Sequence, residues 1–216
     1  MFIVSSQSRN PLKTNNFSTS TIGWVALGTG ITIILAVLLL VLMVTVSMFF
    51  GAINDILNGV FGVSSAVLAW MLYAEHRAKS PLISYIALAF AIVGAIFSIV
   101  GSVLILYGFT DFFLAGLYSG LGNALIGLWL VTFCYSMQHS GMLPHRLISF
   151  GFVVGAFMAL GLIGIPGILA SIDSMAFMPG YLYLALFGWL GTYVLYPIWT
   201  TWLGRILLRK EHVLPL

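Results

Sequence analysis

The segment IGWVALGTGITIILAVLLLVLMVTVSMFF, residues 22–50, contains no charged side chain. A helix needs about 20 predominantly apolar residues to cross the hydrocarbon core of a bilayer. The whole chain follows the same pattern, since 61% of its 216 residues are hydrophobic, 6% are charged and the mean hydropathy is +1.13. Soluble domains carry roughly 25% charged residues. The composition therefore excludes a soluble globular protein and indicates a membrane protein that crosses the bilayer several times.

Six apolar segments are long enough to span a membrane. They cover residues 22–50, 56–73, 82–109, 112–137, 147–170 and 182–203. None alternates polar and apolar residues as a barrel strand would, and a helix satisfies its own backbone polar groups inside lipid. We therefore predict an all-α, polytopic transmembrane bundle of six spans at residues 22–208. A disordered cytoplasmic tail at 1–21 precedes it and a cytoplasmic tail at 209–216 follows.

The basic residues gather in every second loop. They are Arg9 and Lys13 before the first span, Arg77 and Lys79 after the second, Arg146 after the fourth, and Arg205, Arg209 and Lys210 after the sixth. Short loops rich in Lys and Arg stay in the cytoplasm. This segregation predicts that both termini are cytoplasmic.

Four polar residues, Asn54, Asp55, Asp111 and Asp173, fall on the opposite side of the membrane, near the predicted starts of helices or in the loop before the last span. Side-chain oxygens at helix starts cap free N–H groups, and the helix dipole favours a carboxylate there. We expect capping to be their main role, so that Asp111→Asn changes stability little. The alternative is that this outer polar cluster, with Asn58 one turn deeper, binds a cation or a polar ligand through its oxygen donors.

A second set of residues forms a candidate ligand pocket. Trp189, Tyr193 and Tyr196 recur at helical spacing in the last span, where they either pack between helices or form the wall of a small pocket. Asn58 and Asn123, on spans two and four, are expected to face the bundle interior because an unpaired carboxamide in hydrocarbon costs several kcal/mol.

Small residues, a proline and two tryptophans predict how the helices pack and where they end. Glycine spacings that let helices approach closely occur at Gly116 and Gly120, Gly151 and Gly155, Gly59 and Gly62, and Gly161 and Gly164. Pro166 is expected to kink or end the fifth span. Trp199 and Trp202 are placed where tryptophan anchors a helix in the cytoplasmic interface of the membrane.

The sequence argues against several classes of function. The four histidines, His76, His139, His145 and His212, lie near the cytoplasmic edge, and none lies at mid-span to ligate haem. The single cysteine, Cys134, excludes an intramolecular disulfide and a Cys-x-x-Cys motif. No His-Glu-x-x-His motif, mid-membrane lysine or catalytic constellation is present. Without these motifs, we expect no enzyme activity, no metal and no cofactor. We also expect no nucleic-acid partner, because the net charge of +3 is accounted for by loops at the inner leaflet.

The C-terminal half resembles a known group of proteins. Leu143, Pro144, Arg146, Leu147, Phe150 and Gly151 follow a Leu-Pro-x-x-Leu-x-x-aromatic-Gly pattern, and the segments Tyr196-Pro197-Ile198-Trp199 and Trp202-Leu203-Gly204-Arg205 are similar to closing segments of the same group. The group consists of small, uncharacterised bacterial membrane proteins with six spans. The resemblance implies a six-span protein of the bacterial cytoplasmic membrane and no particular activity.

Two hypotheses of function remain. The first is a non-enzymatic bundle that binds a small ligand or transports it, and the second is an accessory or structural subunit of a larger membrane complex. The lipid bilayer is the expected partner in both, and a second copy or a complex subunit is a further partner class. A closed polar cavity reaching Asn58, Asn123 and Tyr193 would favour the first, whereas a lipid-facing groove of small residues would favour the second. The lack of a mid-span charge argues against ion-coupled transport.

Overall fold

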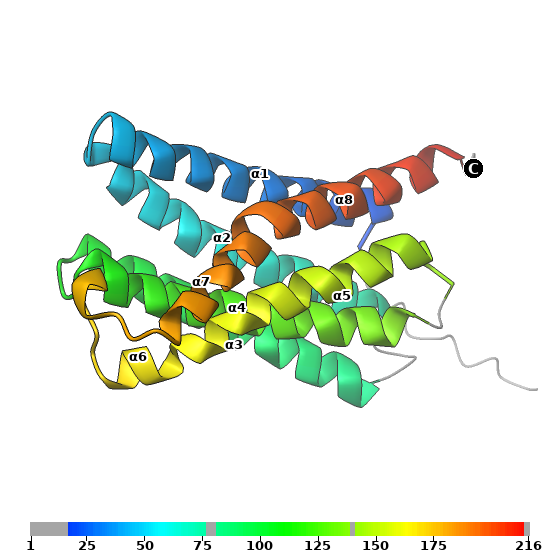
Figure 1. Ribbon diagram of the computed structural model, residues 1–216. Helices are drawn as coiled ribbons and strands as arrows, with labels where there is room; N and C mark the ends of the chain where they lie inside the picture. Colours follow the sequence, from blue (N-terminus) through cyan, green and yellow to red (C-terminus); the bar gives the residue numbers. More distant parts are fainter. Residues whose placement is uncertain (1–16, 77–80, 139–140, 214–216) are drawn as a thin grey trace, which may run out of the picture.

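The computed structural model describes residues 17–76, 81–138 and 141–213, and all of the regular structure in these ranges is helical (Figure 1). The elements in chain order are α1 (Thr19–Thr45), α2 (Phe49–His76), α3 (Pro81–Leu106), α4 (Phe112–Met137), α5 (His145–Ala159), the 3-10 turn η1 (Leu160–Gly164), α6 (Ile165–Leu169), the 3-10 turn η2 (Met175–Phe177), α7 (Leu182–Leu190), the π turn η3 (Gly191–Leu195) and α8 (Tyr196–Val213). Within these ranges, six helical segments are long and apolar enough to cross a membrane. The predicted all-α bundle of six spans is confirmed.

The fifth and sixth spans are each built from more than one element. The fifth runs through α5, η1 and α6, and the sixth through α7, η3 and α8. A 3-10 helix runs from Leu160 to Gly164 and ends two residues before Pro166. The fifth span therefore departs from α geometry where the proline predicts a kink. Proline lacks a backbone donor and its ring conflicts with the carbonyl four residues earlier, so the preceding turn changes its hydrogen bonding.

The first turn lies earlier in the chain than hydropathy predicts. Helix α1 ends at Thr45 and α2 begins at Phe49, whereas the apolar run continues to Phe50. The Oγ of Ser47 accepts a hydrogen bond from the backbone N–H of Phe49 at 3.3 Å and marks the start of α2. Asp55 therefore lies well inside α2 rather than at its first turn, and the prediction that it caps this helix is wrong.

The helices pack largely in sequence order. Helix α2 contacts α1 and α3, α4 contacts α3 and α5, and α8 returns to lie beside α1. The sixth span crosses the molecule obliquely, with α7 against η1 and α5 at one end and α8 against α1 at the other (Figure 1). The sixth span thereby closes the bundle.

Glycine pairs bring the helix backbones together at several crossings, of which three join neighbouring α-helices. A Cβ added at Gly122 in α4 would lie 2.5 Å from the carbonyl oxygen of Gly94 in α3. One added at Gly155 in α5 would lie 2.6 Å from the oxygen of Gly127 in α4, and one at Gly204 in α8 would lie 2.7 Å from that of Gly23 in α1. Small residues permit such approaches in lipid, where van der Waals packing drives helix association.

The predicted glycine pair Gly116 and Gly120 has a different role. A Cβ at Gly120 would meet no heavy atom within 4 Å, and one at Gly116 would meet only Trp189, at 3.9 Å. Gly155, by contrast, packs closely as predicted. The α-carbons of Gly116 and Gly120 line a pocket. The carbonyl oxygen of Gly120 lies on the side of η1, 2.6 Å from a Cβ added at Gly161.

Trp199 is a core residue rather than an interface anchor. Its side chain is fully buried, and its Nε1–H donates to the backbone oxygen of Leu147 at 3.2 Å. Trp202 is 37% exposed and contacts the ring of Phe150. The interface prediction is therefore wrong for Trp199, because the adjacent start of α5 covers this face of α8.

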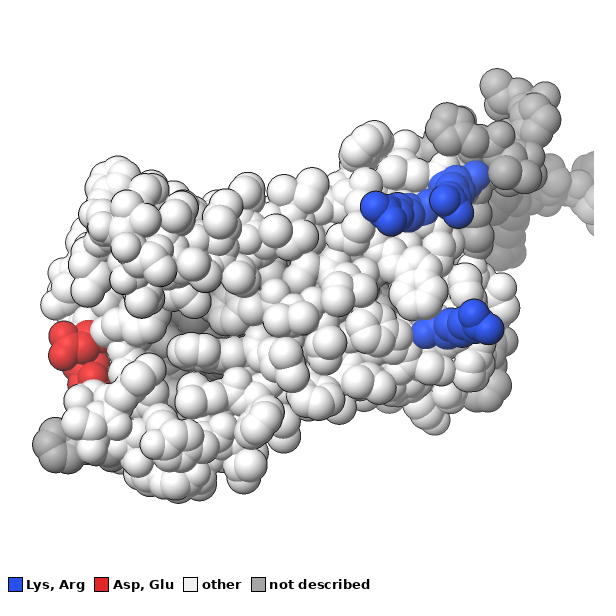
Figure 2. All heavy atoms as spheres, turned by 45° about the horizontal axis from the view of Figure 1, so that its top comes forward, with Lys and Arg blue, Asp and Glu red and all other residues white. Residues whose placement is uncertain are grey.

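The two ends of the bundle differ in charge (Figure 2). We call the end that carries Arg146, Arg205 and Arg209 the basic end, and the end that carries Asp111 and Asp173 the acidic end. The described Lys and Arg residues gather at the basic end, as expected when basic loops alternate in a bundle with an even number of spans. The other basic residues used in the orientation argument lie outside the residues whose side chains are described.

At the acidic end, a carboxylate from the loop before α7 binds the start of α4. Asp111 occupies the N-cap position of α4, but its side chain makes no capping hydrogen bond. The Asp173 carboxylate instead accepts from the backbone N–H of Asp111, at 2.9 Å to Oδ1 and 3.1 Å to Oδ2. The predicted capping by the Asp111 side chain is therefore wrong, and Asp173 satisfies a backbone donor at this helix start.

This arrangement makes Asp173 the more sensitive of the two acids. We expect Asp173→Ala to lower the free energy of unfolding by about 1 kcal/mol, because the N–H of Asp111 loses its acceptor. Asp111→Ala should change it by less than about 0.5 kcal/mol, as surface substitutions generally do. Thermal unfolding in detergent measures both, and an Asp111→Ala variant less stable than Asp173→Ala would contradict the assignment.

Candidate functional site

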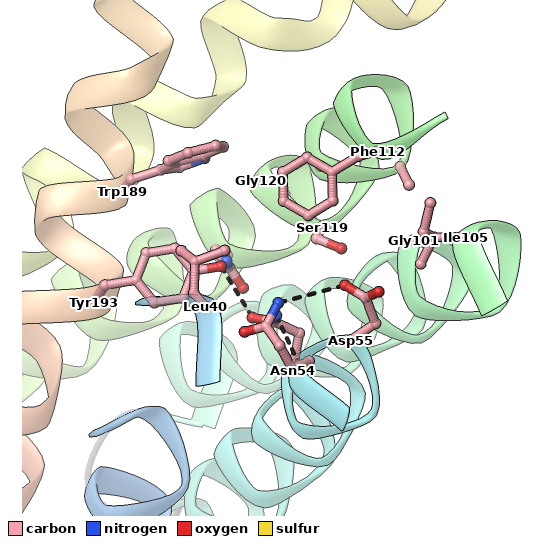
Figure 3. Close-up of a pocket in the computed structure, with 14 residues that line it drawn as sticks. Leu40, Asn54, Asp55, Gly101, Ile105, Phe112, Ser119, Gly120, Trp189 and Tyr193 are labelled. Carbon is pink, nitrogen blue, oxygen red and sulfur yellow. Dashed lines mark hydrogen bonds between the residues drawn. The ribbon is translucent and has the colours of Figure 1, made fainter. Parts of the chain in front are cut away.

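A polar pocket opens inside the bundle towards the acidic end. It is lined by Leu40 of α1, Asn54, Asp55 and Asn58 of α2, Gly101 and Ile105 of α3, Phe112, Ala115, Gly116, Ser119, Gly120 and Asn123 of α4, Trp189 of α7 and Tyr193 of η3. In Figure 3, Trp189 and Tyr193 stand on one side, Asn54 and Asp55 on the other, and Ser119 lies between them. Six elements, from α1 to η3, thus contribute to one site.

Asn58 connects α2 to the sixth span. Its Nδ2 donates to the backbone oxygen of Asn54 at 3.0 Å, and its Oδ1 accepts from the Tyr193 hydroxyl at 3.0 Å. The side chain is 6% exposed. The prediction that Asn58 faces the interior is confirmed, and its partner is the tyrosine of the same predicted pocket.

Asn123 is buried on the α4 side of the pocket. Its side chain is 4% exposed, and its Oδ1 accepts from the Ser98 hydroxyl of α3 at 3.4 Å. The same hydroxyl is 3.1 Å from the backbone oxygen of Gly94, close to the crossing of α3 and α4. The interior position predicted for Asn123 is confirmed, and the residue contributes both to helix packing and to the pocket wall.

Asn54 and Asp55 form the charged side of the pocket. The Nδ2 of Asn54 donates to Oδ1 of Asp55 at 3.4 Å, a long hydrogen bond. Asn54 is 3% exposed, yet its Oδ1 has no hydrogen-bond partner. The amide orientation follows from the neighbouring carboxylate, because reversing it would place two acceptors against each other. The pocket wall therefore contains a buried acceptor that lacks a donor, which is uncommon in folded proteins.

The π turn η3 positions Tyr193. The N–H of Tyr196 bonds to the oxygen of Gly191, five residues earlier, and Pro197 follows. Proline supplies no N–H to the preceding turn and crowds its carbonyl, so the helix widens locally there. Single π turns occur frequently at functional sites, and this one presents a tyrosine to the pocket.

Tyr196 does not belong to this pocket. It is fully buried, its hydroxyl lies 3.2 Å from the Ser65 hydroxyl, and its ring meets Phe61 edge to face. In a regular α-helix Tyr193 and Tyr196 share a face, but the wider π turn between Gly191 and Leu195 alters their relative direction. The predicted pocket therefore comprises Asn58, Asn123, Trp189 and Tyr193, without Tyr196.

The predicted outer polar cluster divides into two pairs. Asn54 and Asp55 line the pocket, whereas Asp173 binds the backbone of Asp111 at the acidic end and neither of these two lines the pocket. Part of the outer cluster and most of the candidate ligand pocket are thus a single site, which the sequence presented as two.

Of the α4 residues that line the pocket, sequence reasoning predicted only Asn123. Phe112, Gly116, Ser119 and Asn123 recur every three or four residues and therefore share one face of that helix. Small and polar side chains on this face leave space rather than bring a helix close. The signal was present in the spacing of Ser119 and Asn123, but the glycines were read as packing residues.

The pocket is small. The space that the centre of a water molecule can reach within it is about 30 Å³, and one water needs about 10 to 15 Å³ by this measure. Asp55, Ile105 and Phe112 also border a wider hollow of about 440 Å³ at the acidic end, together with Met43 and Met48. Asp55 therefore lies between the pocket and a more open region, which is the route of entry that the geometry offers.

Comparison with family models, curated proteins and solved structures finds no match. The resemblance of the C-terminal half to small six-span bacterial proteins therefore remains a prediction. Among the residues that the structure describes, no group of three or more His, Cys, Asp or Glu side chains lies close enough to hold a metal ion. The expected absence of a cofactor also remains a prediction.

The link between Asn58 and Tyr193 is testable by a double-mutant cycle. We expect Asn58→Leu and Tyr193→Phe each to lower the free energy of unfolding by about 1 to 3 kcal/mol, because each leaves a polar partner unpaired. The double variant should lose about 1 kcal/mol less than the sum. Chemical unfolding in detergent measures the coupling. Pairing Tyr193→Phe with Ser65→Ala gives the control. The Tyr193 hydroxyl bonds to Asn58 and the Ser65 hydroxyl to Tyr196, so the two effects should add.

Proposed function

We propose that this protein is a non-enzymatic membrane protein that binds a small polar ligand in the pocket between α2, α4 and η3, as a transporter-like or ligand-sensing bundle. The observation that carries the proposal is a polar cavity that reaches Asn58, Asn123 and Tyr193 and contains an unpaired buried acceptor, Asn54 Oδ1. A buried polar group without a partner costs about 1 to 3 kcal/mol, and a bound ligand would offset that cost.

The accessory-subunit alternative has less support. It requires a lipid-facing groove of small residues that fits a neighbouring helix. The broad groove of about 590 Å³ beside α8 is lined mainly by large side chains, namely Ile34, Tyr193, Val194, Pro197, Ile198, Thr201, Trp202 and Arg205. Its shape and chemistry favour contact with lipid.

The experiment compares two glycine variants in a ligand screen. Gly120→Val places a side chain in open space in the pocket, whereas Gly28→Val places the same side chain in open space on exposed α1. Thermal unfolding of the purified protein is measured with a panel of inorganic cations and small polar compounds. A compound that binds the folded state raises the melting temperature. We expect at least one to stabilise the wild type and Gly28→Val but not Gly120→Val, and equal stabilisation of all three proteins would refute the pocket.

We also propose that the basic end faces the cytoplasm of a bacterial cell and that both termini lie there. The support is the segregation of Lys and Arg between alternate loops. A reporter active only in the cytoplasm should work when fused after Leu216 and fail when inserted at Gly108, in the turn between α3 and α4. The opposite pattern would reverse the orientation.

A further inference from the structure

We propose that the ligand of this pocket is a small monovalent metal cation, Na⁺ or K⁺, held by the Asp55 carboxylate and the Asn54 amide oxygen. This inference rests on the proposed function and assigns a chemical class to its ligand. It follows from the charge, the oxygen donors and the size of the pocket, taken in turn.

The first argument concerns charge. Asp55 is the only charged side chain among the described residues that line the pocket. The described Lys and Arg residues lie at the basic end, away from it (Figure 2). A carboxylate inside a membrane-spanning helix is costly, and such groups generally pair with a cation or mark an ion pathway. The lining residues supply no positive charge, so a bound cation is the partner that the site lacks.

The second argument concerns oxygen donors. The Nδ2 of Asn54 faces the Asp55 carboxylate, which leaves its buried Oδ1 without a donor. The hydroxyl-bearing Ser119 lines the same pocket (Figure 3). Carboxylate, amide and hydroxyl oxygens are the ligands that hard metal cations prefer. A cation would satisfy the acceptor and neutralise the carboxylate together.

The third argument separates monovalent from divalent ions. One carboxylate balances one positive charge, and a divalent ion would leave a net charge of +1 inside the membrane span. Asp111 and Asp173 do not supply the second charge, because neither lines the pocket and the Asp173 carboxylate already accepts from a backbone N–H. The pocket thus matches an ion of charge +1.

The size of the pocket excludes larger cations. A volume of about 30 Å³ has room for a bare metal ion and about one water, by the measure that one water needs about 10 to 15 Å³. An alkylammonium ion with several carbons would require the pocket walls to move. The open hollow next to Asp55 provides access from the acidic end.

The experiment measures thermal unfolding of the full chain in nanodiscs of uncharged lipid. NaCl or KCl is titrated against choline chloride at constant ionic strength, so that charge screening stays equal. We expect a saturable rise of several degrees in the melting temperature with Na⁺ or K⁺. Asp55→Asn should remove this rise, because the amide keeps the shape and loses the charge. Asn54→Ala should shift half-saturation to higher salt, and Asp111→Asn should respond as the wild type does.

Three results would overturn the cation inference. The first is an equal melting temperature of the wild type in all three salts. The second is a rise in the melting temperature of Asp55→Asn with Na⁺ or K⁺ as large as that of the wild type. The third is stabilisation by Ca²⁺ that depends on Asp55 and occurs at a lower concentration than stabilisation by Na⁺ or K⁺. If Asp55→Asn does not fold, the fallback experiment measures the binding of radioactive sodium or rubidium to Gly120→Val and Gly28→Val. Only Gly28→Val should bind the ion. If an uncharged compound stabilises the wild type but not Gly120→Val while salts have no effect, the cation inference fails and the pocket's function stands.

Discussion

Replacing Trp199 with alanine is expected to lower the free energy of unfolding by about 3 to 5 kcal/mol, the range for a large aromatic residue lost from a packed core. Its ring is fully buried and lies between those of Trp129, Phe133 and Tyr196, with centroids 6.1 to 6.3 Å away. The substitution also removes the hydrogen bond to Leu147. Chemical unfolding in mixed detergent measures the loss.

Trp202 supplies the matched control on the same helix. It is 37% exposed and its ring contact with Phe150 is at 6.3 Å. Trp202→Ala should therefore cost less than half as much as Trp199→Ala. Equal losses at the two positions would show that the buried aromatic cluster does not dominate the packing of α8.

A methyl group added at Gly122 is expected to destabilise the bundle by about 3 kcal/mol, at the upper end of overpacking effects. The new Cβ would lie 2.5 Å from the oxygen of Gly94 and 2.6 Å from the backbone nitrogen of Ser98. Both are backbone atoms of α3, so the two helices must separate to accommodate it.

Gly120→Ala is the control, two residues earlier in α4. Its Cβ meets nothing within 4 Å, and alanine is favoured over glycine in a helix by about 1 kcal/mol. We expect its melting temperature to equal or exceed that of the wild type, whereas Gly122→Ala melts well below it. If both variants lost equal stability, the distinction between a helix crossing and an open pocket wall would be wrong.

The polar residues were predictable to different degrees. The interior positions of Asn58 and Asn123 follow from the cost of an unpaired carboxamide in lipid, and the structure buries both. Their partners, Tyr193 and Ser98, lie 135 and 25 residues away in the chain. Which residues meet across the bundle depends on helix rotation, which periodicity along one span does not determine.

The start of α2 differs from the one that hydropathy predicts, and this explains the wrong prediction that Asp55 caps the helix. The chain from α1 into α2 is apolar through the turn at residues 46–48, so hydropathy carries no boundary there. The boundary depends on a local hydrogen bond of Ser47. That shift of one or two turns moves Asp55 from a helix end to a pocket wall.

The sequence by itself determined that the protein lies in a lipid bilayer and how many times it crosses it, because bilayer thickness sets the length of the apolar segments. The alternation of basic loops likewise predicts an orientation without any tertiary information. Only the tertiary structure decided which polar residues form one site. The π turn before Pro197 directs Tyr193 to Asn58 and leaves Tyr196 in the core, and the open space at Gly116 and Gly120 becomes a pocket. Those outcomes depend on how helices rotate and cross, and close packing between distant segments sets that geometry.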